Sequence, residues 1–316
     1  MILTTADLEQ GRETLDSLAA QTVAERIEVL LIASPGSIDE DEAARLGDFH
    51  SLRVIEVDPR SSTARARAAG VAAARAPAVV MAETHCFPLP EWAEALIAAH
   101  RGPWAGVGPV FENANPGAKS WANLFIDYGA WIAPHPGGPD QDLAGHNSSY
   151  KRAALLGYGD ELESWFEAES VLHWDLRARG ERLYVEPRAK VRHVNVDRPI
   201  PAAIEHFYNG RCFGAGRSRG WHPARRALYA IGSPLVPLIR FGRILRHLRR
   251  SGRTDLLPGI LPMMLLSLIT HASGEMTGYV AGTGDALSAI STYELDRDLY
   301  LSGADCAAAV RPKEKA

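Results

Sequence analysis

Apolar strand patterns alternate with helical patterns along the first third of the chain, and this alternation constrains the fold more than any other feature. Helical patterns separate the strands, and the clearest of them is the alanine-rich segment 64–75. Strands that alternate with helices form a parallel sheet covered by helices. The sequence therefore predicts an α/β fold. The strands are expected at 1–5, 27–32, 52–57, 78–82 and 106–111.

The composition is that of a globular protein. The chain has 316 residues, of which 46% are hydrophobic, enough for one sizeable α/β domain and a smaller module. Three widely separated cysteines have no metal-type spacing and favour a reducing, cytoplasmic compartment. No secretory signal pattern opens the sequence. A formal net charge of -4 gives no general attraction to nucleic acid.

Glu83 and His85 lie two positions apart in the segment VVMAETHCFPLPEW, residues 79–92, where a buried strand runs into a turn. Ligands of open α/β sheets bind at the carboxyl ends of such strands. The pair is therefore a candidate site for a divalent cation that holds a diphosphate. The alternative is that both are ordinary polar residues at a strand exit.

A second group of polar residues lies at 145–193. Glu163, Glu167 and Glu169 come before or within the first turns of an expected helix that runs through Leu176. Acidic residues at this position commonly complement the helix dipole. His193 follows an expected strand at 182–185, and taken alone it is more typical of a surface or hydrogen-bonded histidine than of a ligand.

The order and spacing of several motifs over residues 1–195 resemble a family 2 glycosyltransferase with the GT-A fold. The segments TTADLEQGRETLDSLAAQ, from residue 4, and EVLLIAS, 28–34, are similar to the first strand, first helix and second strand of that family. Its Ala-Arg-Asn-x-Gly helix is matched imperfectly by residues 66–70. Glu83 and His85 fall in the register of its Asp-x-Asp motif, with Pro88 and Trp92 at the usual distances.

The resemblance continues in the second group. Gly145, Asn147 and Tyr150-Lys151-Arg152 match a Gly-x-Asn segment followed by aromatic and basic residues. Counting back from Gly180, the catalytic Glu-Asp pair of the family corresponds to Ala168 and Glu169. Pro187, Ala189 and His193 match the closing element of the fold.

The resemblance implies a Rossmann-like, mainly parallel sheet and a set of site residues. Glu169 takes the general-base position, and Glu167 is the alternative if the alignment is shifted by two residues. Glu83, His85 and His193 are the implied ligands of a divalent cation. Imidazole ligands favour Mn²⁺ over Mg²⁺. The implied donor-binding residues are Thr4, Thr5, Ala6, Ser34, Arg67, Thr84, Gly145 and Asn147.

Two departures from the family pattern affect what the resemblance implies. The aspartate that usually follows the second strand and contacts the nucleotide base is replaced around Ala33 and Ser34. Asp39 and Asp41 are possible substitutes or, more simply, caps of the next helix. A Gln-x-x-Arg-Trp motif, associated with processive members, is missing after His193, which indicates transfer of single sugars.

The composition changes after Pro199. Between His206 and Thr254 there are eleven arginines and no acidic residue. The pattern at 239–250 places Phe241, Ile244, Leu245 and Leu248 on one side of a helix and basic residues on the other. This pattern favours an interfacial helix on anionic lipid. The alternative is a helix packed on the catalytic domain with a solvated basic face.

The segment 256–274 has no charged residue over nineteen positions, which is close to a membrane-spanning length, but it contains Pro258, Pro262 and His271. A re-entrant or half-buried membrane helix, or a buried helix, fits these residues better than a clean transmembrane helix. We expect a GT-A domain at 1–200, a basic and apolar helical module at 201–290 and a tail at 291–316.

Together these features predict an inverting enzyme at the cytoplasmic side of the cell membrane, bound as a peripheral or monotopic protein. It would transfer one sugar from a nucleotide sugar, with a UDP-sugar as the expected donor, to a lipid-linked or polysaccharide-precursor acceptor of the cell envelope. Its expected partners include an anionic membrane surface and exclude nucleic acid. The alternative is a catalytically silent GT-A-like protein that binds sugars or serves as a scaffold in a membrane-bound glycan assembly.

Overall fold

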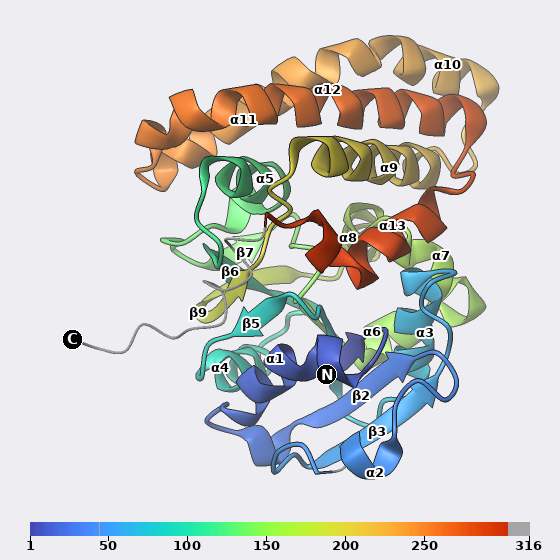
Figure 1. Cartoon of the computed structure of the whole chain (residues 1–316). Helices are drawn as coiled ribbons and strands as arrows, with labels where there is room; N and C mark the ends of the chain where they lie inside the picture. The colour runs from blue at the N-terminus through green and yellow to red at the C-terminus, as the bar shows by residue number, and fades with distance from the viewer. Residues whose placement is uncertain (44, 303–316) are drawn as a thin grey trace. The chain divides into compact units, whose positions relative to one another are not determined.

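The computed structural model describes residues 1–43 and 45–302 (Figure 1). The described chain divides into two compact units. The first comprises Met1–Phe111 and Ala133–Arg192, and the second comprises Glu112–Ile132 and the chain from His193 onward. The chain crosses between the units three times: inside the strand β6 (Gly106–Asn113), between Ile132 and Ala133, and inside the strand β9 (Leu183–His193).

A nine-stranded sheet forms the centre of the first unit. Its parallel part has the order β3-β2-β1-β4. The path then continues through β8, β6, β9 and β5, in which β8 runs antiparallel to both of its neighbours, and β7 pairs with β9. Besides β6 and β9, the strands are β1 (Ile2–Thr4), β2 (Glu28–Ala33), β3 (Ser51–Glu56), β4 (Ala78–Ala82), β5 (Cys86–Pro88), β7 (Gly138–Asp140) and β8 (Ser149–Lys151).

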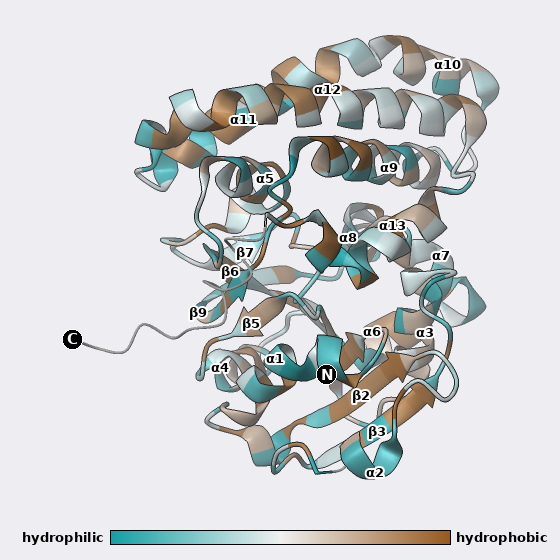
Figure 2. Cartoon of the chain, in the orientation of Figure 1, coloured by the Kyte–Doolittle hydropathy of each residue, from teal (hydrophilic) through white to brown (hydrophobic). Residues whose placement is uncertain are grey.

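The apolar runs of the sequence produce the buried strands. All six residues of β2 are buried, and Figure 2 shows this strand as largely hydrophobic. Strands buried on both faces are typical of parallel sheets covered by helices. The expected α/β, GT-A-like architecture is confirmed. β9 is much longer than the strand expected at 182–185, because its buried residues alternate along eleven positions.

Two helices of the first unit begin at side-chain caps that the sequence supplies. Asp7 accepts a hydrogen bond from the backbone of Gln10, and Ser62 accepts one from Arg65. Gly70 allows close packing on the sheet, since a Cβ atom there would lie 2.6 Å from Ile2 Cγ2. The helices are α1 (Leu8–Ala19), α2 (Glu40–Ala43), α3 (Thr63–Ala73), α4 (Trp92–Ala99), α6 (Arg152–Leu156), α7 (Leu162–Phe166) and α8 (Glu169–Ala178).

The second unit is helical. In it α9 (Pro199–Arg217) and α12 (Leu257–Ala281) pack backbone to backbone through glycines. A Cβ atom at Gly274 would lie 1.9 Å from the carbonyl oxygen of Phe207, and one at Gly210 would lie 2.1 Å from that of His271. The other helices are α5 (Ala118–Tyr128), α10 (Pro223–Gly232), α11 (Val236–Arg250) and α13 (Ala286–Leu295).

One expectation for the C-terminal region differs from the structure. The apolar side predicted to face lipid contains Ile244 and Leu248, which are 3% and 0% exposed, because α11 packs against other helices of the second unit. In α12, Gly274 and Gly278 form the contact with α9 and do not stop the helix, which continues to Ala281.

The expected tail begins within α13, and a 3-10 helix follows at Arg297–Tyr300. The remainder of that tail, residues 303–316, lies outside the described residues.

Candidate active site

Glu83 directly follows β4, at the edge of the sheet where the parallel strands end. The hydroxyl of Thr14 lies 3.1 Å from the Glu83 carbonyl oxygen and 3.0 Å from that of Thr84, which ties this turn to α1. Asn147 Nδ2 donates to Glu83 Oε2 at 2.8 Å. The backbone of Asn147 has a φ of 59°, a left-handed conformation that asparagine tolerates, and its N–H donates to Met81. The Glu83 carboxylate is therefore held in place from two sides.

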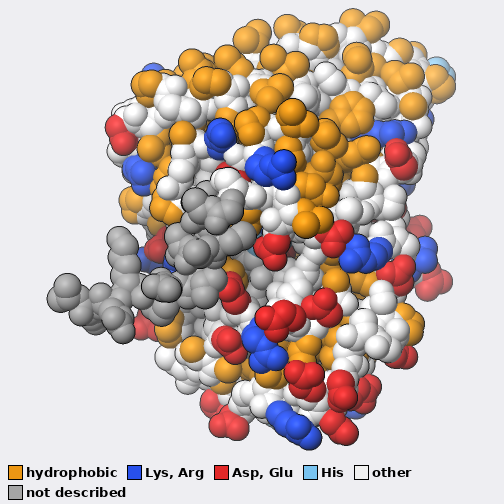
Figure 3. Space-filling view, viewed as in Figure 1, with side chains coloured by type: hydrophobic (Ala, Val, Ile, Leu, Met, Phe, Trp, Pro, Cys, Tyr) orange, Lys and Arg blue, Asp and Glu red, His pale blue; other side chains and the backbone are white. Residues whose placement is uncertain are grey.

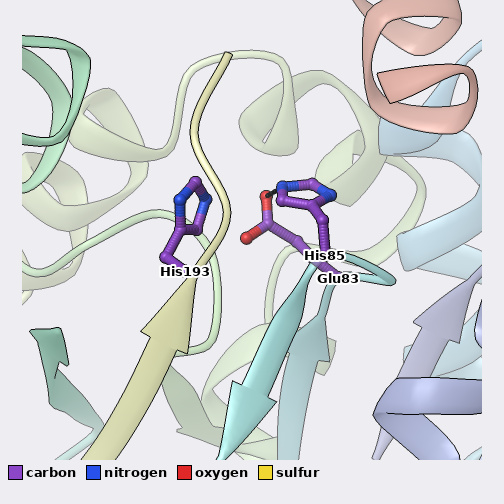
Figure 4. Close-up of side chains that lie close together, drawn as sticks. All are labelled: Glu83, His85 and His193. Atoms are coloured by element: carbon purple, nitrogen blue, oxygen red, sulfur yellow. Dashed lines mark ion pairs between the residues drawn. The ribbon is translucent and has the colours of Figure 1, made fainter. Parts of the chain in front are cut away.

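The three expected metal ligands lie close together. Glu83, His85 and His193 each offer a ligand atom, and these atoms lie within 4.8 Å of one another. Figure 4 shows the Glu83 carboxylate between the two imidazole rings, with His193 at the end of β9. His85 Nε2 lies 3.5 Å from Glu83 Oε1. All three side chains are buried.

This donor set fits a divalent cation. One carboxylate and two imidazoles are ligands that Mn²⁺ and other transition ions accept, whereas Mg²⁺ prefers a site made of oxygen atoms. The ring of Tyr128 packs beside His193, with ring centroids 4.7 Å apart. This contact restricts the orientation of the imidazole.

Glu169 is the first residue of α8 and forms the centre of a second cluster. Arg67 Nη1, from α3, donates to Glu169 Oε1 at 2.6 Å. His146 Nε2 lies 3.2 Å from the same oxygen, and His146 Nδ1 hydrogen-bonds to Glu83. A single imidazole therefore connects the expected base to the expected metal ligand.

Burial would by itself raise the pKa of Glu169, but the hydrogen bond from His146 and the charges of His146 and Arg67 outweigh it and lower the pKa to about 2. Glu169 is therefore ionised at neutral pH. The lack of a side chain at Gly145 leaves room for the Glu169 carboxylate, since a Cβ atom at Gly145 would lie 2.8 Å from Glu169 Cδ.

The expected donor-binding residues of β1 and β2 lie at the same edge of the sheet as Glu83. Leu3 pairs with Ala82 and Thr4 pairs with Ile32, so the strand ends are level. Thr5 Oγ1 donates within its loop to the Asp7 carbonyl at 2.6 Å. The backbone N–H of Ala6 is bound by Gln10 Oε1 at 2.8 Å.

Ser34 donates to Asp58 Oδ1 at 3.0 Å. Asp58 lies just beyond β3, so a carboxylate stands beside the position where the family aspartate is replaced. Asp39 is a helix cap, because its Oδ1 accepts from the backbone of Asp41 at 2.8 Å and of Glu42 at 3.1 Å.

Glu167 lies at the C-terminal end of α7, two residues before Glu169. Glu163 pairs with Arg65 on the surface, with Arg65 Nε 3.3 Å from Glu163 Oε1. Thr84 borders the site through its backbone carbonyl, which accepts from Thr14.

His146 and Asp58 also lie in the candidate site, although the sequence motifs did not identify them. His146 stands between the two motif positions Gly145 and Asn147, and a titratable side chain inside a matched motif was the available signal. Asp58 gave no such signal, because its relation to Ser34 depends on the pairing of β2 with β3.

Residues 1–349 of TarS from S. aureus cover 87% of this chain with 89% of their own length, at 11% identity and a TM-score of 0.42. The same protein in complex with UDP gives 12% identity and a TM-score of 0.41. No curated protein sequence matches the chain. Residues 11–158 match the family model described as Glycosyl transferase family 2. This segment is similar to glycosyl transferase family 2, and the match supports the expected family 2 glycosyltransferase.

Proposed function

We propose that this glycosyltransferase inverts the anomeric configuration and transfers a single sugar from a nucleotide sugar to a lipid-linked or polysaccharide-precursor acceptor at the cytoplasmic membrane face. The observation that carries the catalytic part is the arrangement of Glu169, His146 and Glu83 in one connected cluster with Arg67. The cluster contains a carboxylate base and cationic groups, which are the two requirements of this chemistry.

The leaving group requires cationic groups. As the bond to the sugar breaks, negative charge develops on the departing nucleoside diphosphate. Glu83, His85 and His193 would hold a divalent cation, which supplies Lewis-acid stabilisation of that charge when bound. Arg67 is buried and contacts His146, which in turn contacts Glu83. Its guanidinium is suited to bidentate binding of phosphate oxygens.

Glu169 is the proposed general base. It would accept the proton of the acceptor hydroxyl as the oxygen attacks the anomeric carbon, in a single displacement with inversion. Its pKa of about 2 makes it a weak base as long as Arg67 and His146 are bound to it. Binding of an anionic diphosphate would draw these cations away from Glu169, and its basicity would then rise towards that of an ordinary glutamate.

Nucleotide recognition is assigned to the end of the parallel strands. Thr4, Thr5, Ala6 and Ser34 lie at one edge of the sheet, together with Glu83. The Ser34–Asp58 pair would present a carboxylate acceptor to the N–H of a base such as uracil. This is consistent with a UDP-sugar as the donor.

Residues 201–290 are the proposed membrane-associated module, with the catalytic domain assigned to residues 1–200. Five large apolar side chains between residues 228 and 239 are 55–78% exposed, and the first four of them recur every three or four residues. They are Leu228, Ile231, Leu235, Leu238 and Ile239. Figure 3 shows hydrophobic side chains gathered over α10 and α12.

Arginines on the same helices supply attraction to anionic lipid. Arg225, Arg243, Arg246 and Arg249 are exposed. The segments Pro223–Arg250 and Thr254–Ala281 are long and apolar enough to cross a membrane by length and composition alone. The exposed stripe together with the arginines favours association with the membrane surface.

The catalytic proposal is tested by incubating the full-length protein with UDP-, GDP- and dTDP-sugars, with and without Mn²⁺. We expect release of UDP from a UDP-sugar that increases with Mn²⁺. Absence of turnover over the whole panel, together with no nucleotide binding by calorimetry, would contradict the proposal and would leave a scaffold role.

A further inference from the structure

His193 has a fixed hydrogen-bonding partner at Nδ1, the ring nitrogen that is not the proposed ligand atom. His193 Nδ1 lies 2.8 Å from Asn195 Oδ1, and both residues are buried. An amide oxygen can only accept a hydrogen bond, whereas the amide nitrogen can only donate one. The tautomer of His193 therefore depends on which amide atom of Asn195 faces the ring.

The backbone determines the orientation of the neighbouring asparagine. The backbone N–H of Asn195 donates to Asn115 Oδ1 at 2.9 Å, and Asn115 Nδ2 donates to the Asn195 carbonyl oxygen at 2.9 Å. A flipped Asn115 amide would place two donors together and two acceptors together. The backbone N–H of Asn115 likewise donates to Asn113 Oδ1 at 3.0 Å, which fixes Asn113.

These assignments determine the Asn195 side chain in turn. Its Nδ2 lies 3.3 Å from Asn113 Oδ1 and 3.1 Å from the backbone carbonyl oxygen of His193. Both are acceptors, so the amide nitrogen must be on this side. Oδ1 then faces His193, and His193 Nδ1 must carry the hydrogen.

We propose that Asn195 is a positioning residue that keeps a hydrogen of His193 on Nδ1, so that the Nε2 lone pair serves as the ligand atom for the divalent cation. A histidine ligand typically donates its second ring N–H to a fixed acceptor, which sets both its tautomer and its ring orientation. Asn195 is such an acceptor, and residues of the β6–α5 connection hold it in place. The ligand part of the inference rests on the proposed metal site, whereas the tautomer does not.

The tautomer is measured first, in the metal-free, full-length protein labelled with ¹⁵N-histidine. Long-range ¹H–¹⁵N correlation distinguishes the protonated nitrogen from the unprotonated one, and the His193 signals are assigned by their loss in His193→Gln. We expect a protonated Nδ1. A protonated Nε2 at neutral pH would overturn the proposal whether or not the protein binds metal.

The consequence for metal binding is measured by Mn²⁺ titration calorimetry. We expect Asn195→Leu to mix the tautomers and to weaken Mn²⁺ binding by about 10–100-fold, the usual effect of removing a partner of a metal ligand. Asn195→Asp keeps an oxygen opposite Nδ1 and should retain the hydrogen on Nδ1, while it loses the amide donor to Asn113 Oδ1 and to the His193 carbonyl oxygen.

Ser120→Ala is the structural control. Ser120 Oγ contacts Asn195 Nδ2 at 3.1 Å, so this variant disturbs the same network without removing the acceptor. Equal weakening of Mn²⁺ binding in Ser120→Ala and Asn195→Leu would reduce Asn195 to a structural role. If wild type binds no Mn²⁺ while Nδ1 is protonated, the proposed metal site fails and the tautomer assignment remains.

Discussion

At the scale of single residues, Glu169 combines limited exposure with a low pKa. Its side chain is 19% exposed, and a carboxylate in such a position is usually harder to ionise. Arg67 and His146 reverse this effect by contacting one of its oxygens. Glu169 is thus ionised while these contacts are present, and its strength as a base depends on whether Arg67 and His146 remain bound to it.

Replacing this carboxylate by an amide of the same shape gives the first prediction. We expect Glu169→Gln to lower kcat for sugar transfer by about 10²–10⁴-fold, because the proton acceptor is lost. Binding of the nucleotide should remain, since the proposed donor contacts are made by other residues. Steady-state kinetics and nucleotide calorimetry measure the two effects separately.

Glu167→Gln is the matched control for this prediction, since Glu167 is the alternative base and lies two residues away, at the end of α7. We expect its kcat to be close to that of wild type. A full loss of transfer in Glu167→Gln combined with an active Glu169→Gln would move the base to Glu167.

His206 gives a prediction for the pH dependence of stability. It is 1% exposed, and its Nε2 lies 3.1 Å from Asn123 Oδ1. Burial is the main cause that lowers its pKa from 6.5 to about 4, although the charge of Glu205 acts in the opposite direction. The unfolded chain therefore takes up a proton at a higher pH than the folded one.

The contribution of neutral His206 to stability is complete above about pH 6.5 and is lost progressively as the pH falls towards 4. Between these values the free energy of unfolding should fall with a slope of up to about 1.4 kcal/mol per pH unit from this residue. Urea unfolding from pH 4.5 to 7.5 measures the slope. His206→Gln should have a shallower slope and the exposed His222→Gln should not, so parallel curves for wild type and His206→Gln would refute the assignment.

At the scale of elements, the contact between α9 and α12 depends on four glycines. Cβ atoms at Gly214 and Gly278 would lie 2.3 Å from the carbonyl oxygens of Glu275 and Arg211, in addition to the clashes at Gly210 and Gly274. The pairs are four residues apart on each helix, so one glycine of each turn faces the partner.

Gly274→Ala should therefore destabilise the protein despite the higher helix propensity of alanine. We expect a loss of about 1–3 kcal/mol or more, because the clash is with backbone of the partner helix and cannot be relieved by a rotamer change. Thermal or urea unfolding measures it. Gly242→Ala is the control, since nothing lies within 4 Å of that Cβ position, and it should be stabilising by about 0.5–1 kcal/mol. Similar stability of the two variants would show that α9 and α12 are not in close contact.

The strands and helices of the first unit were largely predictable from local pattern. β4 has the predicted bounds Ala78–Ala82, and the other parallel strands agree within one residue or so at either end. The prediction that the apolar side of α11 faces lipid was wrong, because an amphipathic pattern specifies which side of a helix is apolar but not what covers that side. The long β9 was missed because its alternating residues include polar ones.

Residues of the candidate site could be predicted where they occupy a position of a sequence motif. Residues that belong to the site only through contacts with distant parts of the chain could not. Glu83, His85 and His193 were singled out together, and the structure places them within reach of one ion. The bridge made by His146 and the Asn195 network depend on pairs 63 to 82 residues apart, which no local pattern contains.

At the scale of the whole molecule, the exposed apolar stripe on α10 and α11 gives a prediction about membranes. We expect the full-length protein to sediment with vesicles that contain anionic lipid, and the triple variant Ile231→Ser, Leu235→Ser, Leu238→Ser to lose most of this binding. Burying one such side chain contributes about 1.5–3 kcal/mol, so removing three should weaken partitioning by well over tenfold.

Ile200→Ser is the control, because Ile200 is 72% exposed on α9 and lies outside the stripe. Wild-type binding should fall as salt rises, since arginines supply part of the attraction. A triple variant that sediments as wild type does, or a single Ile200→Ser change with the same effect, would exclude this stripe as the membrane contact.

The glycine contact between α9 and α12 also determines in which solvent this pair of helices can persist. Such a contact gains its energy from dispersion and from Cα–H···O interactions between backbones, and it orders almost no side chains. Neither contribution depends on the presence of water around the pair, unlike the hydrophobic effect that holds the sheet in the first unit. The α9–α12 pair is therefore built to keep its geometry whether its outer surface faces water or lipid.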